Sequence, residues 1–151
     1  MSEVVHLDGM NVAYSIRWGR GMTKAQPEWN RLKSAIEYFQ DYDVEIHIHV
    51  PAWARTRIQC LFEVLLDDSV NFHYIYIPRS DKERDDKDLL AWALLTNGYI
   101  VSNDTMQSHI ENRSIKEEWF STRRIPYHFT KTSEFCPKLP TDFPFPMEEQ
   151  E

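Results

Sequence analysis

Short apolar runs alternate along the chain with longer stretches of helical period. Five runs rich in β-branched and aromatic residues predict strands, the last of them weaker than the others: residues 3–7, 44–50, 72–77, 99–102 and 126–130. Apolar positions three and four residues apart predict helices in the stretches between them: residues 27–42, 57–67 and 86–96, with one or two short helices between 105 and 123. Strands that alternate with helices predict a three-layer α/β/α domain with a central parallel sheet of about five strands.

Composition limits the size of this domain. The chain has 151 residues, of which 42% are hydrophobic, and this amount of apolar surface supports one globular domain. The stretch after Lys138 is rich in proline and carries acidic residues but no basic ones. We therefore expect a domain over residues 1–138 and an acidic, proline-rich tail over residues 139–151, against which Phe143 or Phe145 docks back.

Four aspartates are candidates for a shared site. Asp8 follows the first predicted strand and Asp104 follows the fourth, while Asp85 and Asp86 begin the helix that leads into the fourth strand. Carboxyl ends of parallel strands meet at one edge of the sheet, where such folds bind ligands. Taken singly, each aspartate also suits a turn or a helix cap. Together they favour a site for Mg²⁺ or Mn²⁺, the kind of site that promotes hydrolysis of a phosphodiester.

The net charge of −7, taken for the whole chain, argues against a nucleic-acid partner. The distribution of the charged residues along the chain removes this argument. Eight of the 24 acidic residues lie in the tail or in the candidate site, and the remaining 16 face 17 Lys and Arg. Outside those two regions the chain is therefore not acidic. Nucleic acid remains a candidate partner, and the tail is a candidate for shielding basic loops.

Four motifs resemble those of one ribonuclease family. LDGMNVA at 7–13, VPAWAR at 50–55, DDKDLLAWA at 85–93 and GYIVSNDT at 98–105 together resemble the PIN-like NYN ribonuclease domain of the Regnase (MCPIP, Zc3h12a-like) family. The resemblance covers about residues 3–130. It implies a PIN-like (Rossmannoid) fold and a Mg²⁺-dependent endoribonuclease, with Mn²⁺ as a substitute, that cleaves single-stranded or loop RNA and leaves 5′-phosphate and 3′-hydroxyl ends.

The resemblance also implies roles for individual residues. Asp8, Asp86 and Asp104 match the acids that hold the metal ion, and Asp85 completes or tunes the site. Asn11 matches the polar residue that orients the first acid or a water. These five residues are the expected catalytic set.

Two departures from the family pattern leave an alternative open. Ser108 stands where the family often has a further acid, and the two cysteines, Cys60 and Cys136, are too few and too distant to form the family's CCCH zinc finger. The alternative is a catalytically weak PIN-like module that binds RNA or a protein in an RNA decay or silencing complex.

Basic and aromatic residues occur in the loops expected beside the four aspartates. Arginine and lysine neutralise phosphates, and exposed tryptophan can stack on unpaired bases, although either type also serves as a solubilising or anchoring residue. The expected RNA-binding residues are Arg17, Trp18, Trp53, Arg55, Arg84 and Lys87.

His47 and His49 share one face of the second predicted strand, as two metal ligands would. Because this strand is expected at the centre of the sheet, we interpret them as hydrogen-bonded core histidines instead. His6, two residues before Asp8, is a weaker candidate for supporting the aspartate site.

The remaining expectations concern location and assembly. No apolar run approaches the roughly 20 residues that cross a bilayer, and the first residues do not form a secretory signal pattern. We therefore expect an intracellular, cytoplasmic protein that does not bind membranes. Head-to-tail pairing is frequent among PIN-like nucleases, so the resemblance leaves a homodimer open.

Overall fold

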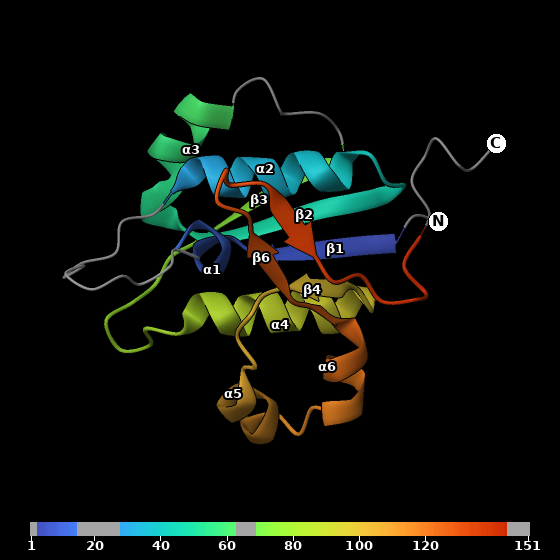
Figure 1. Ribbon diagram of the computed structural model, residues 1–151. Coiled ribbons are helices and arrows are strands. Elements are labelled where there is room, and N and C mark those ends of the chain that lie inside the picture. The colour runs from blue at the N-terminus through green and yellow to red at the C-terminus, as the bar shows by residue number, and fades with distance from the viewer. Residues whose placement is uncertain (1–2, 15–27, 63–68, 145–151) are drawn as a thin grey trace.

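A five-stranded parallel sheet forms the centre of the molecule (Figure 1). The computed structural model describes residues 3–14, 28–62 and 69–144. The strand order is β3-β2-β1-β4-β5, and every neighbouring pair is parallel. The strands are β1 (Glu3–Asp8), β2 (Val44–Pro51), β3 (Val70–Ile75), β4 (Tyr99–Val101) and β5 (Arg124–Ile125). The predicted α/β class with a parallel sheet is therefore confirmed.

Helices cover both faces of this sheet. Figure 1 shows α2 and α4 on opposite sides of the strands, which confirms the three-layer arrangement. The helical segments are α1 (Gly9–Ala13), α2 (Trp29–Gln40), the 3-10 turn η1 (Ala52–Ala54), α3 (Arg55–Phe62), α4 (Arg84–Thr96), α5 (Gln107–Asn112) and α6 (Glu117–Arg123). Within the three described ranges, no helix combines the length and apolar character that a membrane span requires.

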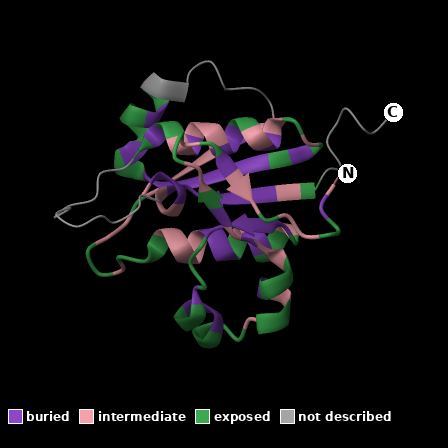
Figure 2. Cartoon of the chain, viewed as in Figure 1, coloured by how far each residue is buried: buried purple, intermediate pink, exposed green. Residues whose placement is uncertain are grey.

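Alternation along the central strands divides the interior into two parts with different chemistry. Figure 2 shows that buried residues are concentrated along the central strands. Val5 and Leu7 of β1 are fully buried in the larger apolar core, which includes α2, whereas His6 between them is buried on the face covered by α4. β2 repeats this pattern with Ile46 and Ile48 in the same core. A smaller apolar cluster joins α4 to the short helices: Leu89, Leu90, Ala93, Ile100, Met106, Ile110 and Phe120.

The order of the strands changes direction between β1 and β4. The chain runs outward from β1 through β2 to β3, and then returns to place β4 on the other side of β1. Such a reversal leaves a crevice at the carboxyl ends of the two strands. Asp8 ends β1 and Asp104 follows β4, so both lie at this reversal.

The predicted fifth strand at 126–130 is wrong in its bounds and its partner. β5 is Arg124–Ile125, and Pro126 ends it because proline has no N–H to continue the ladder. The next three residues form β6 (Tyr127–Phe129), which pairs antiparallel with β7 (Phe135–Pro137) in a separate hairpin. The apolar run therefore contributes to two sheets.

The segment after β7 returns to the core. Leu139 contacts it, and Phe143 is buried with its ring near those of Phe39, Tyr42 and Tyr99, at centroid distances of 5.9, 5.3 and 5.0 Å. The domain boundary placed after residue 138 stays a prediction. Part of the stretch beyond it, however, contributes to the apolar interior.

Candidate active site

Asp8 lies at the carboxyl end of β1 and is 7% exposed. It is also the N-cap of α1, because its Oδ1 accepts a hydrogen bond from the backbone N–H of Asn11 at 3.4 Å. Gly9 allows the chain to turn here: a Cβ at this position would lie 2.9 Å from the carbonyl oxygen of His49 and would overlap the side chain of Val50. The close approach of α1 to β2 therefore fixes the carboxylate at the sheet edge.

One serine hydroxyl connects Asp8 to Asp104. Ser102 Oγ donates to Asp8 Oδ2 at 3.0 Å and accepts from the backbone N–H of Asp104 at 3.1 Å. The Asp104 side chain is exposed, and its Oδ1 accepts from the N–H of Met106 at 2.9 Å. Asp104 thus forms a local turn, as a purely structural aspartate would, and its second oxygen accepts no hydrogen bond from another described residue.

Asp85 and Asp86 occupy the first turn of α4, close to the other two carboxylates. Burial, followed by repulsion from Asp8, Asp85 and Asp104, raises the pKa of Asp86 to about 8. Burial raises the pKa of Asp8 to about 7, although hydrogen bonds from Ser102 and Asn11 oppose the rise. The pKa of Asp85 is also raised, chiefly by burial. Ionisation of this cluster therefore carries an electrostatic cost in the absence of a cation.

The residues around the cluster do not supply a matching positive charge. Within the described ranges, no lysine or arginine forms an ion pair with any of the four aspartates. His109 on α5 lies with Nε2 3.7 Å from Asp86 Oδ2 and 3.4 Å from Glu83 Oε2. An all-oxygen donor set with raised pKa values fits a hard divalent cation.

The present arrangement is not a close metal cage. Among the described residues, no three His, Cys, Asp or Glu side chains converge tightly enough to hold a metal ion directly. Mg²⁺ keeps several of its waters in protein sites, so a looser group of carboxylates suits a hydrated Mg²⁺ better than a fully dehydrated ion.

Asn11 is fixed by two other segments. Its Oδ1 accepts from Tyr127 Oη at 2.6 Å and from the backbone N–H of Asn103 at 3.0 Å. Asn103 and Tyr127 are joined in turn, because the Asn103 amide donates to Tyr127 O at 3.0 Å and accepts from Tyr127 N at 2.9 Å. The ends of β1, β4 and β5 are therefore held together by side-chain amides.

The structure brings together all five residues expected to be catalytic and adds three that the sequence interpretation did not include. Ser102 and His109 contact the carboxylates, and Tyr127 fixes Asn11. Tyr127 follows β5 at the same sheet edge, so the rule for strand ends would have identified it if the fifth strand had been ended at Ile125. His109 carries no comparable signal, since helix α5 has to be placed before its contact with Asp86 becomes visible.

Two of the residues expected to bind RNA lie at the end of β2. The ring of Trp53 is 60% exposed and meets Trp29 edge-on at a centroid distance of 6.4 Å. The guanidinium of Arg55 lies over the ring of Tyr74, with its central carbon 5.4 Å from the ring centroid. One aromatic face and one cation are therefore available at this edge.

The other residues expected to bind RNA differ in how far their charge is already paired. Lys87 Nζ lies 3.0 Å from both carboxylate oxygens of Asp81, which lowers the pKa of Asp81 and occupies the charge of the lysine. Arg84 has a looser contact with Asp81, at 3.8 Å, and its side chain is largely exposed. Arg17 and Trp18 lie outside the described residues.

His47 and His49 are buried and hydrogen-bonded, as predicted. His47 Nδ1 lies 2.6 Å from His73 Nε2, and His49 Nε2 lies 2.9 Å from His6 Nδ1. Asp88 of α4 lies 3.4 Å from His49 Nδ1. These four imidazoles, which we call the histidine cluster, form the polar interior beneath α4 rather than part of the aspartate site.

The sequence model of the family described as Zc3h12a-like Ribonuclease NYN domain matches residues 1–143, nearly the whole chain. No curated protein matches the sequence.

Two solved structures share the fold. A crystal structure of nuclear proteinaceous RNase P 2 (PRORP2) from A. thaliana aligns with a TM-score of 0.65 at 18% identity. A second structure, of nuclear protein-only RNase P 2 from Arabidopsis thaliana, aligns with a TM-score of 0.58, also at 18% identity. Each alignment covers 95% of this chain but 31% of the other, so the chain spans about a third of those proteins. At this identity the likeness shows the fold alone.

Proposed function

Because the chain belongs to the Zc3h12a-like ribonuclease NYN domain family, we propose that it is a metal-dependent endoribonuclease acting on single-stranded or loop RNA. The proposed products carry 5′-phosphate and 3′-hydroxyl ends. RNA is the substrate class that the family implies. The use of Mg²⁺, the roles of the individual site residues and the preference for single-stranded RNA belong to the proposal.

The observation that carries this proposal is the group of aspartates at the strand reversal. Asp8 is buried without a lysine or arginine beside it in the described ranges, and Asp86 has its pKa raised to about 8. Like charges brought together in this way destabilise a folded chain, and a bound cation relieves that cost. A site for a divalent cation therefore gives a physical reason for the arrangement.

Asp8, Asp86 and Asp104 would hold Mg²⁺, for which Mn²⁺ would substitute. When bound, the ion would supply neutralisation of the scissile phosphate and activation of a water. Asp85 would tune the charge of the site from the same turn of α4. Asn11, whose Oδ1 already accepts two hydrogen bonds, would present its amide N–H₂ group toward the reacting region, with its orientation fixed by Tyr127 and Asn103.

The RNA strand would approach along the sheet edge that carries Trp53 and Arg55. Trp53 has an exposed ring face on which an unpaired base can stack, and Arg55 can neutralise a neighbouring phosphate. A base inside a duplex is already stacked on its neighbours, so this surface favours unpaired RNA. Arg84 would add positive charge beside the aspartates, whereas Lys87 would contribute less because it is paired with Asp81.

A cleavage assay on the purified chain tests the proposal. Single-stranded RNA, hairpin RNA and DNA of the same sequence are incubated with Mg²⁺, with Mn²⁺ and with EDTA, and the product ends are identified by their reactivity with kinase and ligase. We expect internal cuts in the unpaired RNA, with either metal, and none with EDTA.

Binding of RNA without cleavage in either metal would instead support the catalytically weak module. Ser108, in place of the acid that the family often has, is the feature that favours this alternative. Ser108→Asp separates the two functions further, because a gain of cleavage on restoring the acid would identify a weakened nuclease rather than an unrelated binding module.

A further inference from the structure

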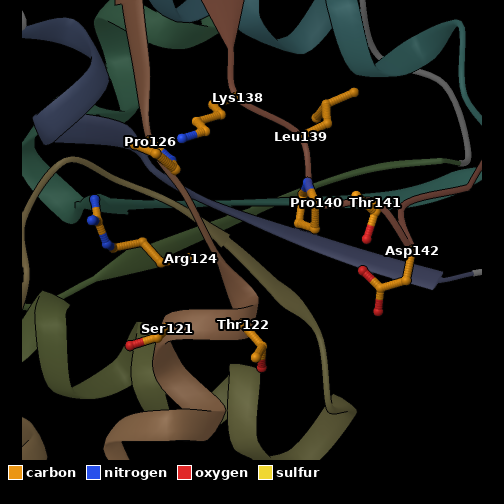
Figure 3. A pocket seen from close by; sticks show the side chains of 9 residues that line it. All are labelled: Ser121, Thr122, Arg124, Pro126, Lys138, Leu139, Pro140, Thr141 and Asp142. Carbon is orange, nitrogen blue, oxygen red and sulfur yellow. The ribbon is translucent and has the colours of Figure 1, made fainter.

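A cavity lies between the end of α6, β5 and the segment that follows β7 (Figure 3). Its volume is about 580 Å³, within the range of sites that take small ligands or one unit of a polymer. Its lining residues are Ser121, Thr122, Arg124, Pro126, Lys138, Leu139, Pro140, Thr141 and Asp142. None of these residues takes part in the proposed chemistry at the aspartates.

The wall formed by the segment after β7 is held in place at both ends. The backbone N–H of Lys138 donates to Pro126 O at 2.8 Å, and Phe143 N donates to Pro140 O at 3.1 Å. Phe143 is buried in the apolar core, and Tyr99 Oη donates to Asp142 O at 3.4 Å. The cavity is therefore bounded by an anchored segment.

The charged residues that line the cavity favour an anion at one end of it. Figure 3 shows the side chains of Arg124 and Lys138 on one side of the cavity and the carboxylate of Asp142 at the opposite end. Within the described ranges, neither cation forms an ion pair with a carboxylate. The hydroxyl of Ser121 lines the same cavity and can donate a hydrogen bond to a phosphate oxygen, whereas that of Thr122 already donates to Trp119 O at 2.8 Å.

A short connection joins this cavity to the aspartates. Arg124 Nη1 donates to the carbonyl oxygen of Ser102 at 3.1 Å, and Ser102 Oγ donates to Asp8 Oδ2 at 3.0 Å. On the other side, Pro126 of the cavity precedes Tyr127, whose hydroxyl fixes Asn11. Two residues that line the cavity, Arg124 and Pro126, are thus linked to the site through Ser102 and Tyr127.

We propose that the Arg124–Lys138 pocket, defined by these two cations and the cavity between them, binds a backbone phosphate of single-stranded RNA that flanks the cleaved position. This inference rests on the proposed function and extends it, because it gives the RNA strand a second point of attachment on the side of the sheet away from Trp53. A strand held on both sides of Asp8 would be drawn across the aspartates.

Lys138→Ala is the main test, since the Lys138 side chain is exposed and its backbone hydrogen bond to Pro126 survives the change. Lys131→Ala, at an equally exposed lysine in the β6–β7 turn, is the matched control. Affinity for a labelled 12-nucleotide single-stranded RNA is measured by fluorescence anisotropy in EDTA over a series of salt concentrations. Arg124→Gln is a second variant, checked for folding because Arg124 also contacts Ser102.

We expect Lys138→Ala to weaken RNA binding by about 3- to 10-fold at low salt and to reduce the slope of log K against log salt by about 0.7, the value for one phosphate contact on a single strand. Lys138→Glu should weaken binding further, and Lys131→Ala should change neither quantity. Equal RNA affinity and equal salt slope for Lys138→Ala and Lys131→Ala would overturn the proposal that the Arg124–Lys138 pocket binds a phosphate.

Cleavage by the unchanged protein is recorded in parallel with Mg²⁺, so the two proposals can fail separately. Cleavage combined with no effect of Lys138→Ala overturns the pocket and leaves the nuclease. A clear effect of Lys138→Ala on binding without any cleavage overturns the nuclease and supports the pocket. If the unchanged protein binds no RNA, the pocket is overturned whatever the cleavage result.

Discussion

The hydroxyl of Tyr127 donates a hydrogen bond to Oδ1 of Asn11 at 2.6 Å, across 116 residues of sequence. Because the same oxygen accepts from the N–H of Asn103, the amide of Asn11 cannot rotate without losing two hydrogen bonds. The N–H₂ end of Asn11 is therefore oriented by Tyr127 and Asn103. This makes Tyr127 a positioning residue for the proposed reaction.

Tyr127→Phe removes this hydrogen bond and keeps the ring in the core. We expect kcat for RNA cleavage to fall by about 3- to 10-fold, the value of one neutral hydrogen bond, while KM stays nearly unchanged. Tyr38→Phe is the control, since Tyr38 also loses a hydroxyl hydrogen bond, to Tyr42 at 3.0 Å, but lies on α2. An equal loss of kcat in both variants would indicate a general effect on stability.

Asp104→Asn should abolish Mg²⁺-dependent cleavage of unstructured RNA while the fold survives. The asparagine Oδ1 can still accept from Met106 N, and the side chain is exposed, so little stability is lost. Loss of one charged ligand removes several kcal/mol of charge stabilisation, a fall in rate on the order of 100-fold or more. Undiminished cleavage, measured beside Asp41→Asn as a surface control, would contradict the assignment of Asp104.

The carboxylates also predict how stability depends on pH without metal. The folded-state pKa of Asp86 is raised to about 8 from 3.8, so its contribution to stability is complete below pH 3.8 and is lost as pH rises through about 8. Asp86→Asn should therefore stabilise the metal-free protein at pH 8, on the order of 1–2 kcal/mol, and have little effect at pH 4. Urea unfolding at the two pH values measures this.

Mg²⁺ provides the complementary measurement for the same variant. Added Mg²⁺ should raise the unfolding midpoint of the unchanged protein at pH 8, because the ion binds the folded state, and should raise that of Asp86→Asn much less. Equal stabilisation of both proteins would show that Asp86 does not contribute to the site.

The histidine cluster predicts the opposite dependence on pH. Burial, with repulsion from His49 and His47, lowers the pKa of His73 to about 4. His73 is therefore protonated below about pH 6.5 in the unfolded chain but only below about pH 4 in the folded protein. The free energy of unfolding consequently falls as pH drops from about 6.5 toward 4. Replacing His73 by Gln should reduce this fall by about 1–2 kcal/mol at pH 5 relative to pH 7.5.

His128→Gln serves as the control for His73→Gln, because His128 is exposed on β6. Urea unfolding at pH 5 and pH 7.5 in saturating Mg²⁺ isolates the histidines from the aspartates. An unchanged pH dependence in His73→Gln would show that His73 takes up its proton as readily in the folded protein as in the unfolded chain.

The sequence was sufficient for most of the architecture because strands β1 to β4 each have a local signal. β2 alternates strictly, and Pro51 ends it; α4 ends at Asn97, which takes a left-handed conformation with φ of 51°. The same rules predict from the sequence that Asp8, Asp86 and Asp104 lie at one edge of the sheet. The three-layer arrangement and the parallel sheet of five strands agreed with the structure for this reason.

What the sequence could not provide depends on contacts between distant segments. Pro126 divides one apolar run between two sheets, and only the pairing of Phe129 with Phe135 reveals the hairpin. His109 reaches Asp86 from a helix of six residues, too short to carry a periodic pattern. Lys87 was expected to bind RNA, but its pairing with Asp81 becomes visible only when the loop before α4 is placed.

Phe143 has a consequence for how the chain folds during synthesis. β1 is the central strand and is made first, yet the aromatic cluster of Phe39, Tyr42 and Tyr99 is closed by a ring made 135 positions after the end of that strand, at residue 143. Until that phenylalanine has left the ribosome, the rings of Phe39, Tyr42 and Tyr99 lack one of their packing partners, and an apolar seam stays exposed. The domain therefore completes its core only at the end of translation of this region, and a chain stopped after residue 138 would keep the seam open.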